Sequence, residues 1–92
     1  MYKVGKVLKI KTLSEIEKAN EEFGRRSPGI NGGMKKYMNR KCTIRRIHSD
    51  GKVNIAGEKL FCYRIKEDYG EFMWREDWFE EIFELEEELF TV

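Results

Sequence analysis

The residues best suited to chemistry lie in a glycine-rich, basic stretch, GRRSPGINGGMKK, at positions 24–36. Glycine amides just before a helical turn, with cations around them, suit a phosphate group. The cations of this stretch are Arg25, Arg26, Lys35 and Lys36. The stretch does not match the P-loop pattern G-x-x-x-x-G-K-[ST]. It therefore predicts either a phosphate- or nucleotide-binding loop or a surface loop whose charges are solvated.

A second basic group lies in residues 40–52 and consists of Arg40, Lys41, Arg45, Arg46, His48 and Lys52. Together with the loop cations it could follow a nucleic-acid backbone, in binding that salt weakens steeply. The alternative is protection of an edge strand by charge. Neighbouring residues of a strand point to opposite faces, so Arg45 and Arg46 are not expected to share one. Tyr37 is the one aromatic residue in the basic segment, so no stacking platform for single strands is evident.

Aromatic residues gather further along the chain, at Tyr63, Tyr69, Phe72, Trp74, Trp78 and Phe79. They could line a groove for an extended peptide. They could equally fill the core, because a small domain depends on large aromatic side chains for burial. We expect Trp74 in the core and take Tyr69 and Trp78 as candidates for contact with a partner.

The C-terminal segment, DWFEEIFELEEELFTV at residues 77–92, is acidic and amphipathic. Its apolar positions at helical spacing are Trp78, Ile82, Leu85 and Leu89. This spacing predicts a helix, with a strand over residues 82–86 as the alternative. The apolar stripe could pack on its own domain, pair with a second copy or dock on a partner, and the carboxylates could imitate a phosphate backbone. The predicted partner-binding residues here are Phe83, Glu84 and Glu87.

Catalytic and metal-binding signals are weak. The single histidine, His48, and the two cysteines, Cys42 and Cys62, form no zinc-binding spacing. No nucleophile motif is present. We expect a non-enzymatic protein without metal or cofactor, whose cysteines stay buried thiols in a cytosolic compartment. The N-terminus does not read as a secretory signal, and no apolar run is long enough to span a membrane.

The N-terminal half predicts a strand, a helix and a helical turn. Alternation of apolar and charged residues over positions 2–10 indicates the strand. Capping boxes begin at Thr12 and at Ser14, and apolar spacing then indicates a helix over 13–23 that ends at Gly24. Residues 34–38 predict a helical turn, which Asn39 closes in a left-handed conformation.

The rest of the chain predicts strands and tight turns. We expect strands over 42–47, around Val53 and Ile55, over 60–66 and from Phe72 to Trp74. Asp50-Gly51 predicts a hairpin turn, and residues 57–59 and 67–71 predict further turns. Five short strands with tight turns are typical of a small barrel. The expected fold is mainly β with α, comprising a barrel domain over residues 1–80 and an acidic C-terminal helix as an extension over 81–92.

Charge is divided along the chain. Residues 1–52 hold 14 Lys and Arg against 5 Asp and Glu, whereas residues 53–92 hold 4 against 12, within a net charge of +1. Such asymmetry indicates a partner surface or self-association, including a possible homodimer.

The pattern as a whole also resembles a known group of proteins. The residues that carry it are Val4-Gly5, Val7, Ile10, Met34, Tyr37, Thr43-Ile44, Ile47, Tyr63-Arg64-Ile65, Gly70, Phe72-Met73-Trp74 and Trp78-Phe79-Glu80. Over residues 1–80 the chain resembles small cytosolic proteins of phages and prophages of Gram-positive bacteria, with a single SH3-like barrel distantly similar to Mind bomb-type domains. The resemblance implies a phage-type protein that binds a host or defence protein, as an inhibitor, and it transfers no active-site residue.

Three functions thus stand as hypotheses in this order: a protein-binding module, a nucleic-acid-binding accessory protein that uses the basic half, and a nucleotide or phosphate sponge that uses the 24–36 loop.

Overall fold

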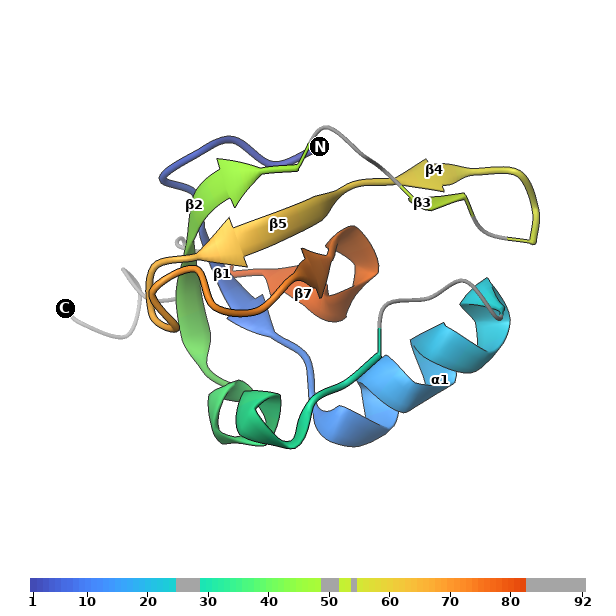
Figure 1. The fold of residues 1–92 in the computed structure, drawn as a ribbon, viewed down its shortest axis with the longest axis horizontal. Coiled ribbons are helices and arrows are strands. Elements are labelled where there is room, and N and C mark those ends of the chain that lie inside the picture. The colour runs from blue at the N-terminus through green and yellow to red at the C-terminus, as the bar shows by residue number, and fades with distance from the viewer. Residues whose placement is uncertain (25–28, 49–51, 54, 83–92) are drawn as a thin grey trace, which may run out of the picture.

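The computed structural model describes residues 1–24, 29–48, 52–53 and 55–82. It contains a five-stranded antiparallel sheet in the order β6-β5-β2-β1-β7 and a separate two-stranded hairpin of β3 and β4. Helix α1 lies alongside the sheet, with its C-terminal end beneath the β3–β4 hairpin (Figure 1). The observed fold is therefore a small mixed α/β domain.

The main-sheet strands are β1 (Val7–Ile10), β2 (Lys41–Ile47), β5 (Cys62–Ile65), β6 (Trp74–Arg75) and β7 (Phe79–Glu81). The hairpin strands are β3 (Lys52–Val53) and β4 (Lys59–Leu60). The helical segments are α1 (Leu13–Phe23) and two 3-10 helices, η1 (Gly32–Tyr37) and η2 (Glu76–Trp78).

Helix α1 has the bounds that the sequence predicts. Of the two capping registers, the one at Thr12 forms: its side chain accepts from the backbone amide of Glu15, and the Glu15 carboxylate accepts from the amide of Thr12. Gly24 ends the helix at φ 104°, in the left-handed range that favours glycine. Ile16 and Phe23 are buried, so the helix packs through the face that its apolar spacing indicates.

The core combines aromatic side chains with aliphatic ones. Trp74 and Trp78 meet edge to face with ring centroids 6.2 Å apart, and Trp74 meets Tyr37 in the same way. Leu8 and Ile10 of β1 are fully buried beside them. The expectation that Trp74 belongs to the core is confirmed. Cys42 and Cys62 are both buried thiols, as expected.

The prediction of a helix over residues 77–92 is wrong for the first residues of that range. Residues 76–78 form η2, and residues 79–81 form β7, which pairs with β1 through Ile10↔Phe79 and Leu8↔Glu81. The strand is favoured because the edge of β1 offers backbone partners and because Lys9 lies 3.2 Å from the Glu80 carboxylate. The sheet therefore extends one residue past the predicted domain boundary, and residues 83–92 lie outside the described residues.

The hairpin predicted at Asp50-Gly51 does not join β2 to the next strand. Val53 of β3 pairs with Lys59 of β4, whereas Ile47 of β2 pairs with Tyr63 of β5. Both edges of β2 are occupied, by β1 and by β5, so β3 cannot add to it. The turns predicted near residues 57–59 and 67–71 do form, and Asn39 is left-handed at φ 61°.

Candidate functional site

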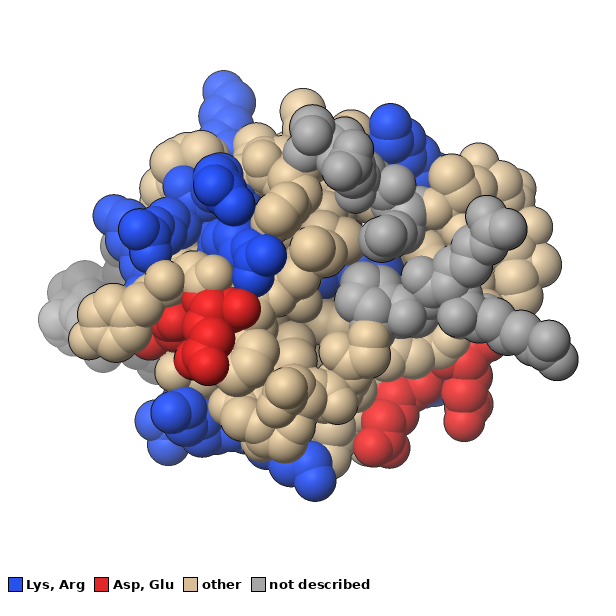
Figure 2. Space-filling model, viewed as in Figure 1, with Lys and Arg blue, Asp and Glu red and all other residues tan. Residues whose placement is uncertain are grey.

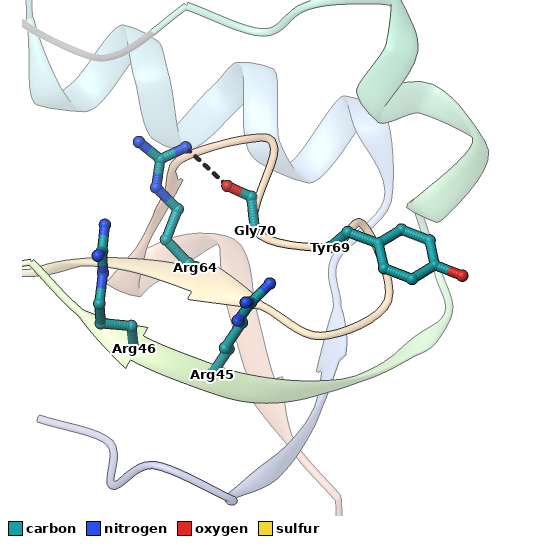
Figure 3. Close-up of a pocket in the computed structure, with 5 residues that line it drawn as sticks. All are labelled: Arg45, Arg46, Arg64, Tyr69 and Gly70. Carbon is teal, nitrogen blue, oxygen red and sulfur yellow. Dashed lines mark hydrogen bonds between the residues drawn. The ribbon is translucent and has the colours of Figure 1, made fainter.

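A pocket of about 320 Å³ lies where β2 and β5 meet the turn after β5. Its lining consists of Arg45, Arg46, Arg64, Tyr69 and Gly70. The three arginine side chains rise from the two strands toward the same side of the sheet, with the turn beside them (Figure 3). In the space-filling view, Lys and Arg side chains form a cluster over β2 and β5 (Figure 2). The pocket is thus a concentrated site of positive charge.

A β-bulge brings Arg45 and Arg46 to one side. Along β2 the pairing with β5 steps from Ile44↔Ile65 to Arg46↔Arg64, so two residues of β2 are used against one of β5. Arg45 is the extra residue, and a bulge of this kind interrupts the alternation of side chains. The expectation that Arg45 and Arg46 cannot share a face is therefore wrong.

The turn after β5 is held from inside by Asp68. This buried carboxylate accepts hydrogen bonds from the amide of Gly70 at 2.9 Å, the amide of Phe72 at 3.2 Å and Nε1 of Trp74 at 2.8 Å. A carboxylate with three donors fixes the loop to the core, since each bond to a charged group is worth about 1.5–3 kcal/mol. The turn that borders the pocket is consequently tied to the core through Asp68.

Tyr69 occupies an unusual position in that turn. Its φ is 56°, in the left-handed region, and the residue is 88% exposed. A bulky residue with positive φ is an outlier, and strained residues of this kind cluster at functional sites. The strain has no compensation from burial of the ring, so packing does not explain why a tyrosine stands here.

The turn also positions two of the arginines. Nη1 of Arg64 donates to the carbonyl oxygens of Gly70 at 3.2 Å and Glu71 at 2.9 Å, while its Nε donates to Nε2 of His48 at 2.8 Å. Gly70 has a φ of 73°, and a β-carbon there would come within 3.1 Å of Nη1 of Arg45. Glycine at this position therefore allows both the turn and the close approach of Arg45.

The arginines of the pocket carry like charges that lie close together. Arg46 and Arg64 lie directly opposite each other on neighbouring strands, a pairing of like charges that destabilises a sheet. Acidic side chains border the cluster in Figure 2. Within residues 1–24, 29–48, 52–53 and 55–82, however, no ion pair joins an acid to Arg45, Arg46 or Arg64.

The other predicted cations do not line this pocket. Lys35 and Lys36 are exposed on η1, where Lys36 Nζ lies 5.2 Å from the ring centre of Tyr37. Lys41 begins β2, about 13 Å along the strand from Arg45 at ~3.3 Å per residue. Arg40, which is exposed, precedes it. The structure therefore divides the basic group between two places.

Several amides of the predicted phosphate loop are already hydrogen-bonded within the domain, including that of Gly33. Asn31 caps η1: its side chain accepts from the amide of Gly33 at 2.9 Å, and its carbonyl accepts from the amide of Met34 at 2.9 Å. A β-carbon at Gly33 would lie 2.8 Å from the Phe72 ring, so this glycine serves packing. Arg25 and Arg26 lie outside the described residues.

The structure also places the predicted partner-binding residues in different environments. Trp78 is fully buried and its Nε1 donates to Oδ1 of Asn20 at 2.9 Å, so the prediction that it offers its ring to a partner is wrong. Tyr69 remains at the surface. Phe83, Glu84 and Glu87 lie outside the described residues.

Sequence reasoning missed Arg64 as a site residue. Alternation in the strand puts Tyr63 and Ile65 inside, which assigns Arg64 to the outer face, and this signal could have found it. The meeting of Arg64 with Arg45 and Arg46 depends on the register of β2 against β5, and no local pattern gives that register.

The described residues give less support for a metal site, a reactive cysteine or a membrane-spanning helix. No cluster of three or more metal-ligating side chains occurs among the residues that the structure describes. Burial raises the pKa of the Cys42 thiol to about 12, which leaves it unreactive near neutral pH. The search for membrane spans, made over the described residues, finds no helix with the necessary length and apolar character.

No family model, curated protein sequence or solved structure matches this chain.

Proposed function

We propose that this protein is a non-enzymatic module that binds single-stranded nucleic acid through the pocket on β2 and β5. The observation that carries the proposal is the placement of Arg45, Arg46 and Arg64 in one pocket that has Tyr69 at its rim, where the exposed ring projects outward from the turn (Figure 3). Guanidinium groups bind phosphate, and an exposed aromatic ring next to them can stack a base. Proteins that bind single strands combine these two elements.

Nucleic acid is favoured over the protein partner that the sequence placed first. Among the described residues predicted to bind a partner, Trp78 is buried and Tyr69 belongs to the arginine pocket. Tyr69 is thus the one predicted partner-binding residue that is both described and exposed. Its place in the arginine pocket supports a polyanionic ligand. A duplex is less suitable, because its bases are stacked internally and a single exposed tyrosine would have no base to bind.

The origin and detailed fold belong to the same proposal. We propose an SH3-like barrel of phage type that acts in the cytoplasm of a host cell; the antiparallel sheet and tight turns of the described residues support the barrel part of this proposal alone. In this setting a binding module would act on the nucleic acid of the phage or its host.

The proposal predicts a definite salt dependence. Neutralisation of three negative phosphate charges by the three arginines gives a slope of log K against log salt of about −2, at ~0.7 per charge for single strands. Raising salt from about 50 to about 200 mM should therefore weaken binding about 15-fold. Removing one arginine should reduce the slope to about −1.4.

Fluorescence anisotropy with a labelled single-stranded oligonucleotide tests this. Arg46→Gln should lower affinity and reduce the slope, whereas Lys18→Gln removes the same charge from exposed α1 and should leave both nearly unchanged. Absence of binding by the unmodified protein at low salt would contradict the proposal, as would equal losses in the two variants.

A further inference from the structure

The pocket carries more positive charge than one internal phosphate of a strand requires. A phosphodiester has a single negative charge, whereas a terminal phosphate monoester carries about −1.5 to −2 at pH 7. We infer that the pocket recognises the phosphorylated end of a single strand, with the terminal phosphate among Arg45, Arg46 and Arg64 and the adjacent base on Tyr69. This inference rests on the proposed function and names its ligand.

The geometry brings three guanidinium groups within reach of one ligand. Arg46 and Arg64 form a directly opposed cross-strand pair, with β-carbons about 4.5–5.5 Å apart. The bulge adds Arg45 to the same pocket. Figure 3 shows all three side chains on the same side of the strands, next to the Tyr69–Gly70 turn. A compact dianion at this point would relieve the repulsion of the arginines for each other.

Arg64 is oriented in advance for such a ligand. Its Nε and Nη1 donate to His48, Gly70 and Glu71, which holds the guanidinium plane against the turn. In the described part of the chain its Nη2 makes no hydrogen bond, nor do the guanidinium groups of Arg45 and Arg46. One fixed arginine and two adjustable ones provide enough donors for the oxygens of a terminal phosphate.

The size of the pocket also favours an end over the interior of a strand. A volume of about 320 Å³ lies at the lower limit for small-ligand sites. Folds that bind the interior of a strand use grooves that cover about 4–16 nucleotides. One exposed ring beside one pocket suits a single terminal nucleotide.

The test compares one oligonucleotide sequence in three forms: with a 5′ phosphate, with a 3′ phosphate and with hydroxyl groups at both ends. We expect one phosphorylated form to bind at least about tenfold more tightly than the hydroxyl form, as a charge-assisted hydrogen bond allows. The end that gives the gain identifies the polarity of binding. Arg45→Gln and Arg46→Gln should remove most of this gain, and Lys18→Gln should keep it.

The alternatives have separate outcomes. Equal binding of all three forms would overturn end recognition and leave the proposed function intact. No binding of any form at low salt would overturn both. If a phosphotyrosine peptide binds as tightly as the phosphorylated oligonucleotide, the pocket reads a phosphate monoester without nucleic acid, and the inference fails. Melting temperatures of all variants, measured by circular dichroism, show whether a loss of binding follows from unfolding.

Discussion

Replacing Tyr69 with asparagine should make the protein more stable and bind less well. A bulky residue in the left-handed region costs about 1–2 kcal/mol, and asparagine tolerates that region. Because Tyr69 is 88% exposed, only roughly 20–30 Å² of its surface is buried, which is worth about 0.6 kcal/mol. The expected net gain is therefore about 1 kcal/mol, or a rise in melting temperature of about 4–8 °C for a domain of this size.

The same substitution removes the stacking surface. Loss of one stacked base costs about 1–3 kcal/mol, so the affinity for a single-stranded oligonucleotide should fall about 5- to 150-fold. Thermal melting and fluorescence anisotropy measure the two quantities on one sample, and Tyr69→Phe serves as the control because it keeps both the strain and the ring. A variant that is less stable than the parent would show that the ring packs on the domain. Unchanged affinity would show that the ring does not contact the ligand.

Three further predictions concern stability. Thr12→Ala removes the cap of α1 and should lower the free energy of unfolding by about 1 kcal/mol in urea titrations, more than Ser14→Ala does. Asp68→Ala leaves Trp74 Nε1 and two amides without their acceptor, and should lower stability by about 3 kcal/mol or more and reduce binding as well. Burial raises the pKa values of Cys42 and Tyr63 to about 12 each, from 9.0 and 10.0. The unfolded chain therefore loses these protons first, so the contribution of these two groups to stability should be constant below pH ~9 and fall as pH rises toward ~12; an unchanged urea midpoint at pH 11 would contradict this.

Local signals in the sequence predict much of this fold. The Thr12 capping box, the apolar spacing of α1 and Gly24 together define the helix, because each acts within one or two turns of the chain. Asn39 takes the left-handed conformation expected of it for the same reason. These elements are determined by local interactions, whatever they pack against.

The errors arise where partners distant in sequence decide the outcome. The apolar spacing assigns residues 79–81 to a helix, and pairing with the edge of β1 selects a strand instead. Arg45 and Arg46 meet only because β2 bulges against β5, and Arg64 joins them from the other strand. The candidate site therefore depends on strand register, which sequence patterning alone does not give.

The most direct test of the arginine–tyrosine pocket is a nitrogen-resolved NMR titration of the full chain with a phosphorylated single-stranded oligonucleotide. We expect chemical-shift changes concentrated on the Nε groups of Arg45, Arg46 and Arg64 and on the amides of residues 66–71. Changes confined to α1 or to Lys35 and Lys36, or no changes at low salt, would contradict the account.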